Sequence, residues 1–290
     1  MELIIDQVSK RYHTKWALRD LSLRFEPGMI GLVGPNGAGK TTLMRIIATL
    51  LQPTTGVVYW NGKDTQKHGA SLRQVLGYLP QEFGVYPEFT GRKFLLYLAA
   101  MKGLPSPLAR ERVEELIETV NLKQIADQRL NTYSGGMKQR IGIAQALIND
   151  PEVLIVDEPT AGLDPEERVR FRTLLASLTA SRIILLSTHI VGDVEAVASR
   201  LILLREGHLV ADTTSQELLT QANGKVWGVT LDLAAAQSLQ MANRVSTMIS
   251  KSDGVYLRLI SASRPHEAAI PVEPNLEEAL LAVNVQVPAS

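Results

Sequence analysis

The sequence predicts an α/β fold in which a mostly parallel sheet carries helices on its outside. Two continuous apolar runs, at residues 153–156 and 183–186, are typical of strands that are buried on both faces. Between them, residues 166–178 show helical spacing. Because neighbouring parallel strands need a crossover connection, usually a helix, this alternation of strand and helix indicates a parallel sheet.

The first half of the chain begins with a strand, a loop and a helix. An apolar strand from Gly28 leads into a glycine-rich loop at 34–42, and apolar residues then recur at helical spacing up to Leu50. The other elements predicted there are strands at 56–61 and 76–79 and helices at 94–102, 108–120 and 136–148.

The second half completes this unit and adds an appendage. Helices at 166–178 and 191–199 serve as crossovers, and a hairpin of 201–204 and 208–212 closes the unit near residue 220. In the remaining 221–290, strands are predicted at 225–233 and 254–260 and helices at 234–241 and 276–283. We expect domains at 1–220 and 221–290, the second a small α+β domain. Alternatively, the uncharged stretch near Ala234 is a linker.

Composition excludes several classes of protein. The 290 residues include 30 Lys and Arg against 30 Asp and Glu, so the formal net charge is +0, which argues against a strongly basic nucleic-acid binder. Hydrophobic residues make up 45% of the chain, enough to bury a sizeable core. Cysteine is absent, which excludes disulfides, thiolate metal sites and thiol catalysis.

Membrane spans and secretory signals are not expected. Apolar runs are strand-sized, well short of the roughly 20 residues that cross a bilayer. The first twelve residues lack the basic flank and long apolar centre of a secretory signal. A cytoplasmic location is therefore the expectation.

The glycine-rich loop carries the first chemical motif. Residues 34–41 fit the pattern G-x-x-x-x-G-K-[ST], between a strand and a helix. Glycines let consecutive backbone N–H groups surround a phosphate, and the helix that follows points its positive end there. Lys40 would contact the β- and γ-phosphates, and Thr41 would offer a hydroxyl to Mg²⁺. The predicted phosphate-binding residues are Gly34, Asn36, Gly37, Ala38, Gly39, Lys40, Thr41 and Thr42.

Two carboxylates form the second motif. Asp157 and Glu158 follow directly after the buried strand at 153–156, where parallel strands present side chains to a ligand crevice. Asp157 would hold Mg²⁺, and Glu158 would polarise the attacking water. The competing interpretation, two solvated acids at a strand end, loses weight beside a complete phosphate loop.

A third motif opens the helix at 136–148. Ser134 is a natural helix cap, and Gly135 and Gly136 leave the N–H groups of the first turn uncovered, which makes a second anion site. Taken alone, these residues would be an ordinary capped helix. Their meaning depends on the other motifs.

Together, the motifs resemble those of the ATP-binding cassette ATPases, the nucleotide-binding subunits of ABC transporters, over residues 2–220. The matching elements, in order, are the phosphate loop, a glutamine loop at Gln81, the signature Ser134-Gly135-Gly136, the strand ending in Asp157-Glu158, the D-loop Ala161-Gly162-Leu163-Asp164 and the switch Ser187-Thr188-His189. The signature separates this family from other phosphate-loop ATPases. Tyr133 and Met137 depart from it, standing where Leu and Gln are common.

The resemblance implies a phosphate-loop NTPase core, an antiparallel β subdomain and a helical signature subdomain at about 84–150. It also implies that Tyr12 stacks on adenine, although Trp16 lies nearby and either could be packing only. Glu158 would be the catalytic base, Gln81 and His189 would assist, and Gln81 would approach Mg²⁺ with Thr41 and Asp157. Asp164, with the signature, would belong to the nucleotide site.

The resemblance further implies partners. In this family the signature closes the nucleotide site of a second chain, so we expect a head-to-tail pair, taken as a homodimer, with two ATP molecules between Lys40 of one protomer and Ser134 of the other. A separate membrane permease would be driven by the motion of this pair. The segment 82–90, with its three aromatic residues, would contact the permease. Alternatively, these aromatics only cover the core of the helical subdomain. The tail at 274–280 is similar to those of exporter ATPases, which favours export over import. The rival is a soluble ABC ATPase acting on nucleic acid, ribosomes or cluster assembly.

Overall fold

The computed structural model describes residues 1–160, 163–188 and 190–283. They form two compact units, Met1–Asp212 and Thr213–Ser290. The boundary expected near residue 220 falls inside helix α8 (Ser215–Ala222), which packs against α10 (Leu276–Val283). Because α8 packs against α10 of the second unit, α8 belongs to that unit, which therefore begins before this helix.

A six-stranded sheet lies at the centre of the first unit. In spatial order its strands are β10 (His208–Thr213), β9 (Arg200–Arg205), β3 (Gly28–Val33), β8 (Ile183–Thr188), β7 (Val153–Asp157) and β6 (Leu76–Leu79). The pairs β9–β3, β3–β8, β8–β7 and β7–β6 are parallel. The expected mostly parallel sheet is confirmed.

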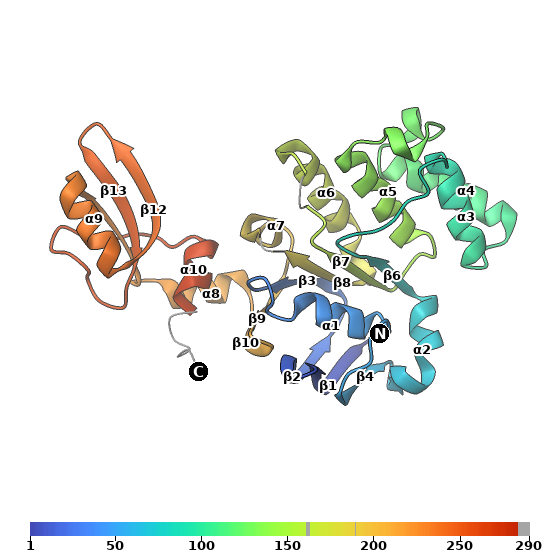
Figure 1. The fold of residues 1–290 in the computed structure, drawn as a ribbon, viewed down its shortest axis with the longest axis horizontal. Helices are drawn as coiled ribbons and strands as arrows, with labels where there is room; N and C mark the ends of the chain where they lie inside the picture. Colours follow the sequence, from blue (N-terminus) through green and yellow to red (C-terminus); the bar gives the residue numbers. More distant parts are fainter. Residues whose placement is uncertain (161–162, 189, 284–290) are drawn as a thin grey trace. The chain divides into compact units, whose positions relative to one another are not determined.

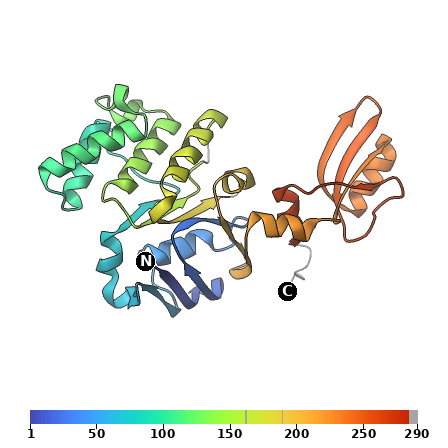
Figure 2. The ribbon, with the colours of Figure 1, turned by 180° about the vertical axis from the view of Figure 1, so that it is seen from behind.

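An antiparallel sheet covers one face of the central sheet with α1 (Lys40–Ile47) between them (Figures 1 and 2). Its strands are β2 (Lys15–Phe25), β1 (Leu3–Tyr12), β4 (Thr55–Trp60) and β5 (Lys63–Asp64). The layers share one core, to which β7 contributes Val153 and Ile155. Leu154 and Val156 alternate to the opposite face and are also buried, which explains the continuous apolar run.

Helices make up the rest of the first unit. Their bounds are α2 (Thr65–Gln74), α3 (Gly91–Met101), α4 (Ser106–Thr119), α5 (Gly135–Leu147), α6 (Pro165–Ser177) and α7 (Val191–Glu195). The helices α3, α4 and α5 pack on one another as the helical subdomain, and α6 and α7 lie on the face of the sheet opposite α1 (Figure 1).

Helix α7 is shorter than the helix predicted at 191–199. Its last residue is Glu195, and the backbone N–H of Ser199 donates to Met29 O in β3 rather than continuing a helix. The chain turns there because it must enter β9 beside β3.

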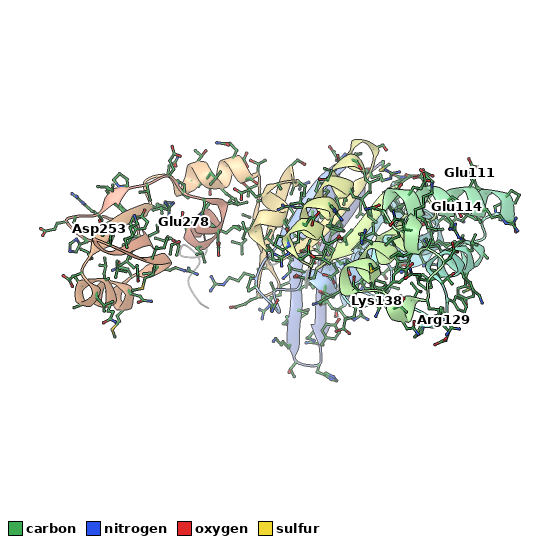
Figure 3. The ribbon with its side chains drawn as sticks, turned by 90° about the horizontal axis from the view of Figure 1, so that it is seen from above. Glu111, Glu114, Arg129, Lys138, Asp253 and Glu278 are labelled. Carbon is green, nitrogen blue, oxygen red and sulfur yellow. The ribbon has the colours of Figure 1, made fainter. Side chains whose placement is uncertain are left out.

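The second unit is a small α+β domain. Its sheet runs in the order β12 (Arg244–Lys251), β13 (Gly254–Ile260), β11 (Val226–Leu231) and β14 (Ile270–Pro271). Helix α9 (Leu233–Ala242) packs against β11, β12 and β13. Ala234 therefore lies in a helix and not in a linker. On α10, Glu278, labelled in Figure 3, pairs with Arg258 of β13.

Candidate functional site

The ends of four parallel strands bring together, at one edge of the central sheet, the phosphate loop, Gln81, Asp157-Glu158 and Ser187-Thr188. The register pairs Val33 with Thr188, Asp157 with Ser187, and Leu79 with Val156. The phosphate loop therefore leaves β3 beside the end of β8, β7 ends on the other side of β8, and Gln81 follows β6 at the same edge. This arrangement places sequence-distant motifs within one site.

Glycine is required in the phosphate loop at Gly39. Its φ of 107° lies in the left-handed region, and an added Cβ would come within 2.5 Å of Ala17 O. Gly39 is also the residue before α1, so the first N–H groups of that helix open onto the loop. The loop has the backbone form that an anion site needs.

Lys40 folds back over the loop that precedes it. Its ammonium donates to Gly34 O at 2.7 Å and to Pro35 O at 3.3 Å, and lies 3.8 Å from Glu158 Oε1. Only 6% of the residue is exposed. A buried cation is thus held between the phosphate loop and the end of β7.

Asp157 is fully buried at the end of β7. Its Oδ1 accepts a hydrogen bond from Ser187 Oγ, and among the described residues its Oδ2 has no hydrogen-bond partner. Burial, with a smaller contribution from the charge of Asp157, raises the pKa of the Tyr78 phenol on β6. A buried carboxylate oxygen without a partner is costly unless a cation or water contacts it.

Glu158 turns the chain sharply after β7. Its φ is 51°, uncommon for a residue other than glycine, and its N–H donates to Ser187, to the carbonyl O at 3.1 Å and to Oγ at 3.0 Å. This turn separates the directions of Asp157 and Glu158. The two acids therefore occupy different surroundings.

A cavity of about 580 Å³ gathers most of the predicted site residues. Those that line it are Tyr12, Asn36, Gly37, Ala38, Gly39, Lys40, Thr41, Thr42, Gln81 and Glu158. Lys15, Trp16 and Ala17 from the start of β2 complete the lining. Of these three, the sequence singled out Trp16 alone, as an alternative to Tyr12.

Both aromatic candidates for a base-stacking role lie in this lining. Tyr12 is 43% exposed and has the Lys10 ammonium 5.4 Å from its ring centre. Trp16 is half-buried, and the Arg11 guanidinium lies 5.2 Å from its ring centre. The geometry leaves both rings available to a ligand.

The signature lies outside this cavity. Ser134, Gly135 and Gly136 stand at the start of α5 in the helical subdomain, and Ser134 Oγ caps that helix by accepting from Met137 N at 3.2 Å. Asp164 also lies outside and caps α6, accepting from Glu167 N at 2.8 Å. The switch residue His189 and the D-loop residues Ala161 and Gly162 lie outside the described residues.

Tyr133, the first departure from the common signature, is a buried anchor. Its hydroxyl donates to Ile125 O at 2.8 Å. A Cβ at Gly91 would lie 2.5 Å from this hydroxyl, so Gly91 makes room for it. Packing and this hydrogen bond therefore position Tyr133, the residue before Ser134.

Comparisons with known proteins identify the family. The chain matches the ABC transporter family over residues 18–161. It is 39% identical over 215 residues to the Nod factor export ATP-binding protein I of Burkholderia pseudomallei. The aligned residues cover 73% of this chain and 71% of that protein. The chain belongs to the ABC transporter family of ATP-binding proteins.

Two further ABC proteins support the same family assignment. The daunorubicin resistance ATP-binding protein DrrA3 of Streptomyces coeruleorubidus is 36% identical over 224 residues, 77% of this chain and 71% of that protein. A dimeric ATP-binding cassette in a post-hydrolysis state, bound to ADP and Pi, superposes with a TM-score of 0.67 at 26% identity, covering 73% of this chain and 98% of that one. This ABC protein is an ATPase. Across the described parts of the chain, no helix combines the length and apolar character that a bilayer span needs.

Proposed function

We propose that this ABC ATPase powers an exporter by closing and opening as a head-to-tail homodimer on a separate membrane permease. The observation that carries the proposal is the separation of the phosphate loop from the signature within one chain. The phosphate loop and Glu158 line one cavity, whereas Ser134 at the start of α5 is not part of its lining. A second copy can supply the missing signature to each cavity.

The proposed site residues have different roles toward ATP. The ammonium of Lys40 and the N–H groups of the loop bind phosphate oxygens, and Tyr12 or Trp16 stacks on the base. Glu158 accepts the proton of the attacking water. Gln81 and His189 act beside the γ-phosphate, and Asp164 approaches the site across the dimer.

Mg²⁺ fits the residues at this edge of the sheet. The buried Asp157 Oδ2 has no hydrogen-bond partner among the described residues, and the exposed Thr41 supplies a hydroxyl in the cavity. Oxygen donors of these types suit Mg²⁺. Asp157, Thr41 and Gln81 would hold the ion, which when bound neutralises charge on the phosphates.

Differential binding explains how hydrolysis becomes motion. The γ-phosphate of ATP contacts both Lys40 of one copy and the Ser134 segment of the other, so ATP favours the closed pair. After in-line attack by water, ADP and phosphate no longer join the two surfaces. The pair then reopens, and this cycle is the mechanical output.

An aromatic surface after Gln81 is the proposed contact with the permease. The rings of Tyr86, Phe89 and Tyr97 pack together, with centroids 5.1 to 5.8 Å apart. Tyr86 is 49% exposed and Tyr97 is 38% exposed. Exposed aromatics of this kind are frequent at protein interfaces. Phe83 instead packs against Gly142 of α5, as a residue covering the subdomain core would.

Export is favoured by the relatives whose names specify a process. One acts in Nod factor export and another in daunorubicin resistance. An ATPase working with a permease would sit at the cytoplasmic face of the membrane, held there by protein contacts. The formal net charge of +0 argues against direct attraction to nucleic acid or anionic lipid.

Purification of the tagged full chain from detergent-solubilised membranes tests the proposal. The expected result is a helical permease that co-purifies in stoichiometric amount, and whose recovery falls in the double variant Tyr86→Ser/Tyr97→Ser. Glu111→Ser, another exposed position of the helical subdomain, is the control. Recovery of ribosomes or nucleic acid in place of a permease would overturn the assignment to export.

A further inference from the structure

A buried hydrogen bond joins the segments that follow β7 and β8. Thr160, two residues beyond Glu158, donates through Oγ1 to Oδ2 of Asp193 on α7. Thr160 is 1% exposed and Asp193 is 2% exposed. The bond therefore links the turn that carries Glu158 to α7, the helix that comes after β8, away from solvent.

Helix α6 holds the same carboxylate from a third direction. Arg172 Nη1 lies 3.7 Å from Asp193 Oδ1 and donates to Gly192 O at 3.0 Å. Asp193 thus has one oxygen on the Thr160 hydroxyl and the other near the Arg172 guanidinium. A buried carboxylate needs such partners, because desolvation without them is costly.

Thr160 also fixes the start of the segment that leads to α6. Its carbonyl accepts from Leu163 N at 3.1 Å, and Arg168 of α6 donates to Leu163 O at 3.0 Å. The side chain of Thr160 therefore bonds to α7, and its carbonyl bonds to Leu163, the residue before Asp164, which caps α6.

The turn at Glu158 depends on these anchors. A φ of 51° at a glutamate is strained, and such a conformation persists where the surroundings over-determine it. Before the turn, Asp157 is bonded to Ser187. After it, Thr160 is bonded to Asp193. The strained residue therefore lies between two side-chain hydrogen bonds, one to β8 and one to α7.

We propose that Asp193 is a positioning residue for hydrolysis, acting through Thr160 to hold the Glu158 carboxylate in its reactive direction. The inference rests on the proposed role of Glu158 as the base. Asp193 is separated from the nucleotide cavity, whose lining includes neither Asp193 nor Thr160. Its loss should slow the chemical step and leave ATP binding intact.

The test compares kcat and ATP affinity in full-length variants. Asp193→Leu keeps a similar size but removes the acceptor, and Thr160→Val removes the donor. Each should lower kcat by about 10- to 100-fold, the scale of a misplaced catalytic group, with nucleotide affinity unchanged. Thr160→Ser retains the hydroxyl and should restore most of the rate. Wild-type kcat in folded Thr160→Val would overturn the proposal.

A matched control separates positioning from general loss of stability. Glu278 is another buried carboxylate, 1% exposed and paired with Arg258, but it lies in the second unit. Glu278→Gln should lower stability while kcat per folded chain stays at the wild-type value. An equal fall of kcat in this control would contradict a specific role for Asp193.

A double variant distinguishes failure of this inference from failure of the base assignment. If Glu158→Gln turns over normally, the proposed base is wrong whatever Asp193 does. If Glu158→Gln is inactive, adding Asp193→Leu should leave the residual rate unchanged, because there is no base left to position. A further fall by the full single-variant factor would show that Asp193 acts independently of Glu158 and would overturn the inference.

Discussion

Ser134 and Met137 cap the start of α5 reciprocally: Ser134 Oγ accepts from Met137 N, and Met137 Sδ accepts from Ser134 N, both at 3.2 Å. A capping box usually places Glu or Gln at the third helical position, and a thioether is a weak acceptor. Met137 therefore keeps the geometry of the signature with a weaker bond. Since the Ser134 hydroxyl acts here as an acceptor, it can donate to a phosphate at the same time.

This reciprocal cap predicts opposite effects of two substitutions. Met137→Gln supplies a stronger acceptor and should stabilise the first unit by up to about 1 kcal/mol, whereas Ser134→Ala should destabilise it by about 1 kcal/mol. Urea unfolding followed by circular dichroism measures both. Equal stability of Met137→Gln and Met137→Leu would show that an acceptor at this position contributes nothing.

Lys40→Ala should weaken ATP binding strongly. Loss of charge-assisted hydrogen bonds worth about 1.5–3 kcal/mol each corresponds to at least a tenfold rise in Kd. Titration with a fluorescent ATP analogue measures it. Lys67→Ala, whose side chain is 77% exposed on α2, is the control and should bind normally. Unchanged affinity in Lys40→Ala would refute the phosphate-binding role of the loop.

Mixing variants tests whether sites are shared between copies. Ser134→Arg protein mixed with wild type should reduce ATPase activity more steeply than the wild-type fraction falls, because a mixed pair with one blocked site does not close and loses the activity of both sites. The control is Ser252→Arg, in an exposed turn of the second unit, which should leave activity unchanged. Activity strictly proportional to the wild-type fraction would count against a pair that closes only when both shared sites are intact.

Glu278 makes the stability of the second unit depend on pH. Burial alone would raise the pKa of its carboxyl, but hydrogen bonds from Arg258, Ser246 and the Asn275 backbone outweigh this and hold the pKa below its usual value. A depressed pKa in the folded state gives stability that is present above the unfolded pKa of about 4.3 and is lost as pH falls through the folded pKa.

Hydrogen exchange of the amides in α10 and β13, corrected for intrinsic rates, measures this effect in the full chain. Glu278→Gln should reduce protection near pH 7 by about 1–3 kcal/mol, and the difference from wild type should shrink below about pH 4.3. Parallel pH profiles in the two proteins would contradict the role of the ionised carboxylate.

Much of the fold was predictable because its signals are local and strong. The runs in β7 and β8 are apolar on both faces, and the phosphate-loop pattern needs no tertiary information. Other signals were weaker but present. Leu21, Leu23 and Phe25 alternate along β2, and Thr214 and Glu217 form the capping box of α8. Neither β2 nor α8 is among the elements predicted from the sequence.

Tertiary contacts determined what the sequence could not predict. The end of α7 is set by the bond from Ser199 to Met29, distant in sequence, and β12 is a half-exposed edge strand with little apolar alternation. In the site, the tie between Thr160 and Asp193 joins residues far apart in the chain. Only the fold brings such pairs together.

Two copies of this chain are proposed to enclose ATP between the phosphate loop of one and the signature of the other. Light scattering of Glu158→Gln with and without ATP tests this arrangement most directly, because this variant should bind ATP without hydrolysing it. We expect a single chain without nucleotide and a stable dimer with ATP, and we expect the dimer to be lost again in Glu158→Gln/Ser134→Arg. A Glu158→Gln protein that binds ATP fully and keeps the mass of one chain would contradict it.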